Sequence, residues 1–247
     1  MTPQKNNIVT KQIFSAFCIV ELLILIVLKV FSIVFVRSYK ETLLMFSAIL
    51  INALFMLFLT LRVKKAGLDT KITGIPLAVF VTLLADCFLV LLKDFADLEI
   101  IDFISADTST MIGFVIFGLV QVIYAIHLGI TKRRLAVRIA FYLVFVAVVY
   151  ALGMMTFDRL LACLSMSQLI LNTVYAWIEH HKNKTPASLW LALGITLFFG
   201  CDSLIMMRML LTPSGFIYEA VCFMVWVFYI PSQVVLTTSY LVERTKN

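Results

Sequence analysis

Charged side chains are scarce in this sequence: they make up 14% of its 247 residues, while 62% are hydrophobic. A water-soluble domain is nearer to a quarter charged and half apolar. The mean hydropathy is +1.05, and apolar runs of about 20 residues, each long enough to cross a hydrocarbon core of about 30 Å, recur along the whole length. The chain is therefore expected to be an integral membrane protein with no room for a soluble domain.

Familiar catalytic signatures are absent as well. The sequence has no Gly-x-Ser-x-Gly elbow, no P-loop and no His-Glu-x-x-His. Of its three histidines, His127 alone lies near an apolar span, and His180 and His181 are expected in a solvated basic loop, so a membrane-embedded zinc site lacks ligands. The cysteines lie within apolar spans and have neither metal-ligand nor disulfide settings, so we expect them to pack. They are Cys18, Cys87, Cys163, Cys201 and Cys222.

Eight transmembrane helices are predicted, because a chain that crosses a bilayer must satisfy its backbone hydrogen bonds internally. The first apolar segment lacks the small-residue cleavage site of a signal peptide and counts as a span. The predicted spans are 13–36, 42–62, 72–92, 108–130, 135–154, 158–178, 187–207 and 218–241. The connections are short, except for an acidic loop at 93–107. The expected fold is an all-α, single-domain, polytopic membrane helix bundle.

Lysine and arginine are distributed unequally between the two ends of this bundle. The N-terminus, the loops near 62–71, 131–138 and 179–186, and the C-terminus hold fourteen, and the opposite side holds five. Cytoplasmic loops accumulate basic residues, so both termini are predicted to be cytoplasmic, which requires an even number of spans. The same bias explains the net charge of +6, so nucleic acid is not an expected partner.

Four charged residues lie well away from the ends of the predicted spans: Glu21, Lys29, Asp86 and Asp202. Ionisable side chains are costly in lipid and mark functional sites by default. Structural ion pairs or a small hydrated cavity also explain Glu21 and Lys29, and Lys29 could instead neutralise an aspartate. Asp86 and Asp202 each lie 15 residues from the inner end of an outward-running span, so we expect both at the same depth, about 22 Å along their helices.

Two carboxyl groups that meet in a water-poor interior can share one proton at neutral pH, so that one acts as an acid and the other as a base. Acid-catalysed hydrolysis of an ether, an acetal or a vinyl ether requires such a pair. A proton-coupled transporter uses the same residue types, and composition does not separate the two functions.

Two of the apolar segments, from the third and fourth predicted spans, resemble motifs of the YhhN/TMEM86 family, whose characterised members are eight-span lysoplasmalogenases. GIPLAVFVTLLADCFLVLL is similar to the family's third-span segment and places Asp86 on the family aspartate. IGFVIFGLVQVIYAIHL resembles the family's Gly-x-x-x-Phe-x-x-x-His-x-x-Tyr helix, matched by Gly113, Phe117 and Tyr124. Together with Gln121, these residues have the spacing of one helix face.

Two later segments extend the resemblance, which runs from about the second span to the end. LWLALGITLFFGCDSLIMM resembles the family's seventh-span Ser-Asp-Ser-Leu segment, with Asp202 and Ser203 in place. VFYIPSQVVLTTSYL resembles its final Tyr-Tyr-x-x-Gln helix, which gives Tyr229 and Gln233. Three positions depart from the pattern: Gln121 replaces a histidine and cannot transfer a proton near neutral pH, Ala85 replaces a glycine, and Cys201 replaces a serine.

The resemblance implies a hydrolase that cleaves the vinyl ether of alkenyl lysophospholipids to a fatty aldehyde and a glycerophospho-alcohol. It implies Asp86 and Asp202 as the acid/base pair, with no metal or organic cofactor. The residues expected to bind substrate or water are Tyr124, Gln121, Tyr229, Gln233, Ser203 and Lys29. The alternative functions are a catalytically silent lipid-binding relative, which the Gln121 departure favours, and a transporter. The alternative role for Tyr124 and Tyr229 is packing within the bundle.

Lipids are the expected partners: the lysophospholipid substrate and the surrounding membrane lipids. A homo-oligomer is compatible with the sequence, which leaves the oligomeric state open. The expected location is the cytoplasmic membrane in a bacterium and the endoplasmic reticulum in a eukaryote.

Overall fold

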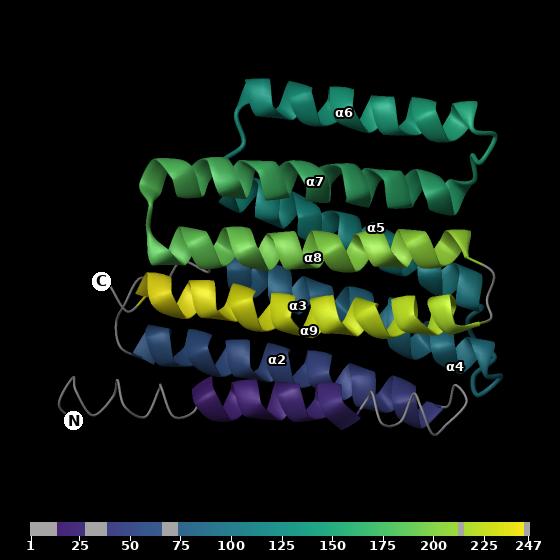
Figure 1. Cartoon of the computed structure of the whole chain (residues 1–247), viewed down its shortest axis with the longest axis horizontal. Coiled ribbons are helices and arrows are strands. Elements are labelled where there is room, and N and C mark those ends of the chain that lie inside the picture. Colours follow the sequence, from purple (N-terminus) through teal and green to yellow (C-terminus); the bar gives the residue numbers. More distant parts are fainter. Residues whose placement is uncertain (1–13, 28–38, 66–73, 212–214, 245–247) are drawn as a thin grey trace.

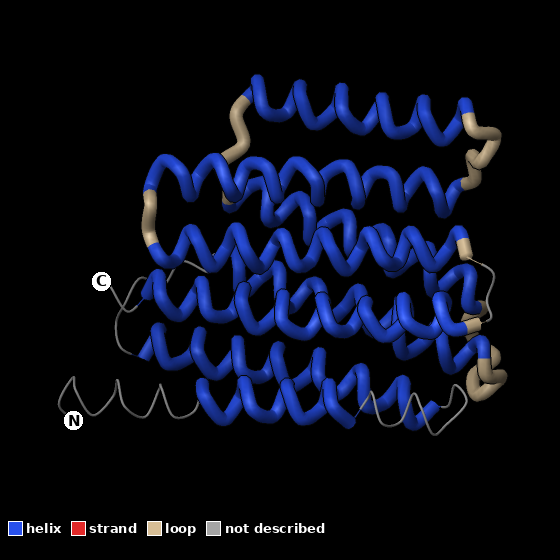
Figure 2. The backbone as a smooth tube through the Cα atoms, viewed as in Figure 1, coloured by secondary structure: helices blue, strands red, loops and turns tan. Residues whose placement is uncertain are grey.

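The protein is a bundle of long helices. The computed structural model describes residues 14–27, 39–65, 74–211 and 215–244, and every regular element in these ranges is a helix (Figure 2). They are Phe14–Val27, α2 (Tyr39–Lys65), α3 (Gly74–Asp86), the π-helix η1 (Cys87–Leu92), α4 (Lys93–Asp97), α5 (Ala106–His127), α6 (Lys132–Ala151), α7 (Phe157–Asn183), α8 (Pro186–Leu210) and α9 (Phe216–Arg244).

Seven of the described helical stretches are long and apolar enough to cross a membrane, with α3, η1 and α4 joined as one stretch, Gly74–Asp97. The shorter apolar helix Phe14–Val27 is the described part of the predicted first span. The predicted all-helical, multi-pass membrane bundle is confirmed. Successive long helices run in opposite directions (Figure 1). The cytoplasmic location of both termini stays a prediction.

The prediction of loops is wrong for parts of two segments, because helices continue there beyond the apolar runs. The acidic segment 93–107 is helical through Asp97 and again from Ala106, so only 98–105 connects the two helices. His180 and His181 lie in the last turn of α7 rather than in a loop. A helix can continue through polar residues beyond the hydrocarbon core, because its backbone remains hydrogen-bonded there. The length of an apolar run therefore does not predict where the helix ends.

Three helix starts follow directly from local sequence. Ser105, Thr131 and Thr185 precede α5, α6 and α8, and each side-chain oxygen accepts a hydrogen bond from the backbone N–H three residues later at 3.2 Å. These are N-caps, which satisfy one of the free N–H groups of a first turn. Pro186 follows the cap of α8 at the first helical position, where its missing N–H costs nothing.

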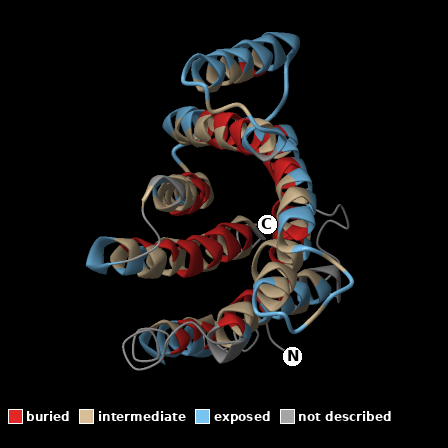
Figure 3. Cartoon of the chain, turned by 90° about the vertical axis from the view of Figure 1, so that its right-hand side faces the viewer, coloured by how far each residue is buried: buried red, intermediate tan, exposed pale blue. Residues whose placement is uncertain are grey.

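Five helices form a closed ring. α3 packs against α5, α5 against α7, α7 against α8, α8 against α9, and α9 against α3, while α3 and α8 do not contact each other directly. Among the described helices, α2 packs outside the ring against α3 and α9, and α6 packs only against α7. Figure 3 shows these layers end-on, with the buried residues on the faces that the helices turn toward one another. The ring therefore brings α9 between the two helices that carry Asp86 and Asp202.

The most extensive helix contact, between α8 and α9, depends on two glycines of α8. A Cβ atom at Gly194 would lie 2.8 Å from Cγ of Leu236 and 3.1 Å from its backbone nitrogen, and a Cβ atom at Gly200 would lie 2.6 Å from the ring of Phe228. Small residues at such positions allow helix backbones to approach closely in a membrane.

We expect Gly194→Ala to lower the thermal unfolding midpoint of the purified protein, because the added methyl group has no room beside the backbone of Leu236. Overpacking of this kind costs about 1–3 kcal/mol. Gly118→Ala in α5 is the matched control, since its nearest neighbour is Ser165 Oγ at 3.7 Å. Unfolding curves recorded in the same detergent compare the two variants, and equal midpoints would contradict the packing argument.

Candidate functional site

Asp86 is a buried carboxylic acid at a change of helix type. It is 6% exposed and is the last residue of α3, directly before the π-helix η1. Short π-helical segments in α-helices are rare and often lie at functional sites. The sequence LLADCFLVLL gives no local signal for this change, so the structure alone shows that Asp86 stands at the junction.

Tyr229 of α9 binds this carboxyl group: its hydroxyl donates a hydrogen bond to Asp86 Oδ2. The tyrosine ring is buried and held edge-on by two aromatic neighbours, Phe198 at 5.8 Å and Trp226 at 5.6 Å between ring centroids. Phe117 of α5 packs edge-on against Phe198 in turn, at 5.4 Å. The acid therefore has one polar partner in an otherwise aromatic and apolar setting, which excludes water and strengthens electrostatic interactions.

Asp202 of α8 belongs to the same cluster. It is half-buried, and its carboxyl group interacts electrostatically with that of Asp86. Its neighbour Cys201 is 1% exposed and interacts with both aspartates. Since α3 and α8 have no direct contact, the two acids interact across the interior of the ring. We call Asp86, Asp202 and Tyr229 the acid cluster.

Two further predicted residues lie near the acid cluster with polar atoms that have no partner among the described residues. Tyr124 is fully buried, its hydroxyl is unpartnered, and it interacts electrostatically with Tyr229. Gln233 lies one helical turn from Tyr229, and its Oε1 accepts from Asn52 Nδ2 at 3.4 Å while its Nε2 is unpartnered. Buried polar atoms are normally hydrogen-bonded, so unpartnered ones mark places where water or a ligand can bind.

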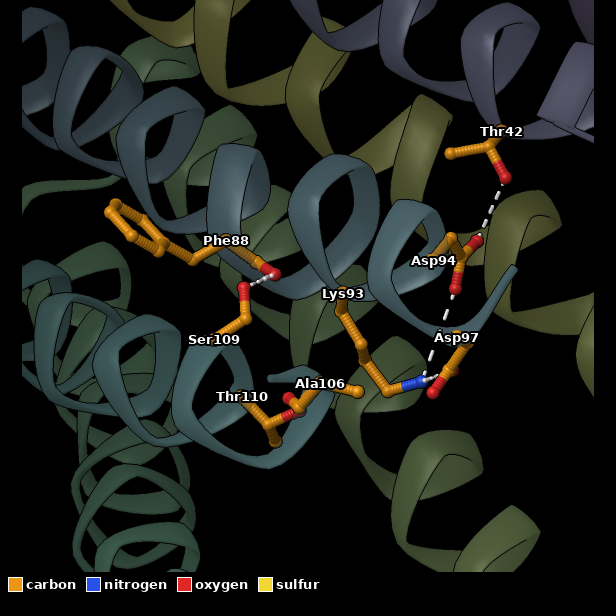
Figure 4. A network of polar contacts seen from close by, with 8 residues as sticks. All are labelled: Thr42, Phe88, Lys93, Asp94, Asp97, Ala106, Ser109 and Thr110. Atoms are coloured by element: carbon orange, nitrogen blue, oxygen red, sulfur yellow. Dashed lines mark hydrogen bonds and ion pairs between the residues drawn. The ribbon is translucent and has the colours of Figure 1, made fainter. Parts of the chain in front are cut away.

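A second set of contacts fixes the π-helix that follows Asp86. Ser109 of α5 is fully buried, and its hydroxyl donates to the carbonyl of Phe88 at 2.7 Å (Figure 4). Beyond η1, Thr42 of α2 donates to Asp94 Oδ2 at 2.9 Å, and Lys93 pairs with Asp97 at 2.7 Å. These contacts join α2, α4 and α5 around η1 and so hold the backbone that carries Asp86.

The other described candidate residues form no hydrogen bond to Asp86, Asp202 or Tyr229. Gln121 is buried in α5 and accepts two hydrogen bonds from Asn172 Nδ2 of α7, one at its backbone oxygen and one at Oε1. The hydroxyl of Ser203 donates to the carbonyl of Phe199 within its own helix. Glu21 is buried, and its Oε1 has no partner among the described residues. Lys29 lies outside the described residues.

Several buried polar residues were not predicted from the sequence. Asn52 bridges Gln233 and Thr237, whose hydroxyl donates to Asn52 Oδ1 at 3.1 Å. Asn172 joins Gln121 to Arg138 of α6. The signal for both asparagines is an amide within an apolar run, ILINALF and LILNTVY, because an amide in a bilayer must find a partner.

All five cysteines are free thiols, and Cys163 and Cys201 are buried. This agrees with the predicted packing role. The helix face predicted from the spacing of Gly113, Phe117, Gln121 and Tyr124 is confirmed as well, since all four residues are buried.

The acid cluster can hold and move a proton. Two carboxyl groups close enough to interact, one of them bound by a hydroxyl, give an acid and a base on opposite sides of a shared interior. The aromatic and apolar residues around them suit a hydrocarbon chain.

The sequence model of the YhhN family matches residues 44–240, from α2 to near the end of α9 and through every residue of the acid cluster. No curated protein and no solved structure matches the chain. Because the match covers most of its length, the chain belongs to the YhhN family.

Proposed function

We propose that the protein is a lysoplasmalogenase-like hydrolase, which cleaves the vinyl ether bond of alkenyl lysophospholipids with Asp86 and Asp202 as its acid and base. Three features support the proposal: membership of the YhhN family, the electrostatic interaction between Asp86 and Asp202, and the hydrogen bond from Tyr229 to Asp86. The single observation that carries it is the meeting of two acids from distant helices inside an apolar ring.

The contact with Tyr229 assigns the two roles. A hydroxyl that donates to a carboxyl oxygen stabilises the carboxylate form, so Asp86 carries the negative charge and Asp202 holds the proton. Asp202 gives its proton to the alkenyl carbon farther from the ether oxygen. The carbon bound to oxygen becomes an oxocarbenium ion, which the carboxylate of Asp86 stabilises.

Water completes the reaction. Asp86 orients a water molecule and accepts one of its protons as the water oxygen bonds to the oxocarbenium carbon. The proton that Asp86 accepted passes to the glycerol oxygen as the hemiacetal breaks its bond to that oxygen. The hemiacetal hydroxyl returns its proton to Asp202, and a fatty aldehyde and a glycerophospho-alcohol are released. We assign the binding of the water or the glycerol oxygens to Tyr124 and Gln233, because each has a buried polar group without a partner among the described residues.

Purified protein incubated with an alkenyl lysophospholipid is expected to release fatty aldehyde, measured by an aldehyde-trapping reagent and mass spectrometry. The matched alkyl lysophospholipid, which lacks the double bond, is the control and should yield none, because only the vinyl ether forms an oxocarbenium ion on protonation of carbon. A folded protein that binds the alkenyl lipid without releasing aldehyde would contradict the enzyme and favour a lipid-binding or transport role.

A further inference from the structure

Arg138 is a buried cation in a helix that otherwise faces outward. It is 3% exposed and is the only buried residue of α6, which packs only against α7 among the described helices. It lies six residues after the start of α6, about 9 Å along the helix. A long basic side chain at this depth could reach the bilayer surface, where its charge would be hydrated. Arg138 instead turns into the bundle.

The guanidinium group has polar neighbours and no countercharge among the described residues. Its Nη1 donates to Gln168 Oε1 at 2.9 Å and its Nη2 to Asn172 Oδ1 at 2.8 Å. The ring of Tyr175 lies 5.2 Å from its central carbon, and Arg134 stacks on the same ring at 4.7 Å. Within the described part of the chain no carboxylate pairs with Arg138, and the ionisable neighbours that act on it are Tyr175 and Arg134. A buried charge without a partner is strongly unfavourable.

Hydrogen-bond donors around Arg138 are also left without acceptors. Its own Nε is buried and unpartnered. Gln121 Nε2, joined to Arg138 through Asn172, is another unpartnered donor, and so is the hydroxyl of Ser165, which shares the α7 face of Gln168 and Asn172. Among the described residues, these two donors and the Nε of Arg138 itself lack acceptors, which is the chemistry of a site for an oxyanion.

The start of α6 also favours a bound anion. Its first turn carries Lys132, Arg133 and Arg134 and no acidic residue. Positive charge is unfavourable at a helix N-terminus, which itself carries a partial positive charge. An anion bound here would therefore compensate both the first turn of α6 and the buried guanidinium group.

We propose that Arg138, with the unpartnered donors of Gln121 and Ser165, binds a phosphate group between α6 and α7, where Asn172 of α7 also bonds to Gln121 of α5. Arginine is suited to this ligand because its planar N–H groups match two oxygens of a phosphate. The phosphate can belong to a phospholipid head group or to a free ion, and the experiment separates these sources. The site is distinct from the acid cluster and does not depend on the proposed hydrolase activity.

Thermal unfolding of the full-length protein in phosphate-free maltoside detergent tests the site. The probes are a short-chain phosphatidylglycerol, the diacylglycerol with the same acyl chains, and inorganic phosphate at matched ionic strength. We expect the phospholipid to raise the midpoint by roughly 5 °C at about 100 times its dissociation constant, and the diacylglycerol to have no effect. A comparable rise with inorganic phosphate would support the site and show that the free ion suffices.

Arg138→Gln is expected to lose most of this rise, because it removes the cation and the Nε donor. If that variant does not fold, Arg138→Lys keeps the charge but not the paired N–H geometry, and it should lose at least half of the rise. Arg159→Gln is the matched control: this exposed arginine lies at the other end of α7, bound to the carbonyl of Met154, and should keep the full rise.

Three outcomes would overturn the proposal. One is a midpoint that neither phosphate probe changes. Another is an equal rise with diacylglycerol, which would show that the phosphate is not recognised. The third is a full rise in the Arg138 variants, which would place the phosphate elsewhere on the protein.

Discussion

Asp202→Asn and Asp86→Asn are each expected to lower the rate of aldehyde release by about 10³-fold, within the range that a positioned acid or base contributes. Asparagine has nearly the shape of aspartate and keeps a hydrogen-bonding oxygen, but at position 202 it cannot carry the proton that must reach the alkenyl carbon. At position 86 it lacks the negative charge that stabilises the oxocarbenium ion and cannot accept a proton from the water. Both variants should fold, since each exchanges a buried acid for a neutral group.

Asp102→Asn is the matched control for these variants. Asp102 is exposed in the connection between α4 and α5, and its replacement should leave the rate unchanged. Single-turnover measurements with saturating alkenyl lysophospholipid separate the chemical step from substrate binding. Near-normal turnover in either variant of the acid cluster would rule out catalysis by the pair, while equal losses in all three would point to a general defect in folding.

Tyr229→Phe has the next largest expected effect, a fall of roughly 10- to 100-fold in turnover. A hydrogen bond to a charged group is worth about 1.5–3 kcal/mol, and each 1.36 kcal/mol in the barrier is about tenfold in rate. Phenylalanine keeps the ring and its edge-on contacts with Phe198 and Trp226. The variant therefore removes the hydroxyl that donates to Asp86 with little change in packing.

The control for this substitution is Tyr150→Phe, at a side chain that is 73% exposed on α6. It should change neither turnover nor the unfolding midpoint. Turnover and the substrate concentration for half-maximal rate are measured for both variants. If Tyr229→Phe only weakened substrate binding and left turnover intact, Tyr229 would be a contact for the lipid and would not set the protonation of Asp86.

Much of the architecture could be predicted from local properties of the chain. Apolar runs of bilayer length fix the number and approximate position of the long helices, because the backbone in lipid has no alternative partner for its hydrogen bonds. The inward face of α5 follows from the helical spacing of Gly113, Phe117, Gln121 and Tyr124, all of which are buried. The ends of helices were less predictable, as the extension of α7 through His180 and His181 shows.

Candidate residues could also be named in advance, but their partners could not. Asp86 and Asp202 stand out because an ionisable side chain in a span is costly. That Tyr229 binds Asp86, while Gln121 turns away to Asn172, depends on which helices are neighbours. The lipid-facing and protein-facing residues of an apolar helix are of the same kind. Its sequence therefore does not predict which face packs against which neighbouring helix.

The sequence alone is enough to predict that this chain crosses a membrane as a helix bundle with two acids in its apolar segments. The packing of the helices is needed to show that α9 lies between α3 and α8 and brings a tyrosine to Asp86. It is also needed to show that Arg138 is buried without a countercharge among the described residues. The physical reason is that span formation depends on each segment's own transfer into lipid. The pairing of spans depends instead on close packing at small residues, such as Gly194 against Leu236, which no single segment specifies.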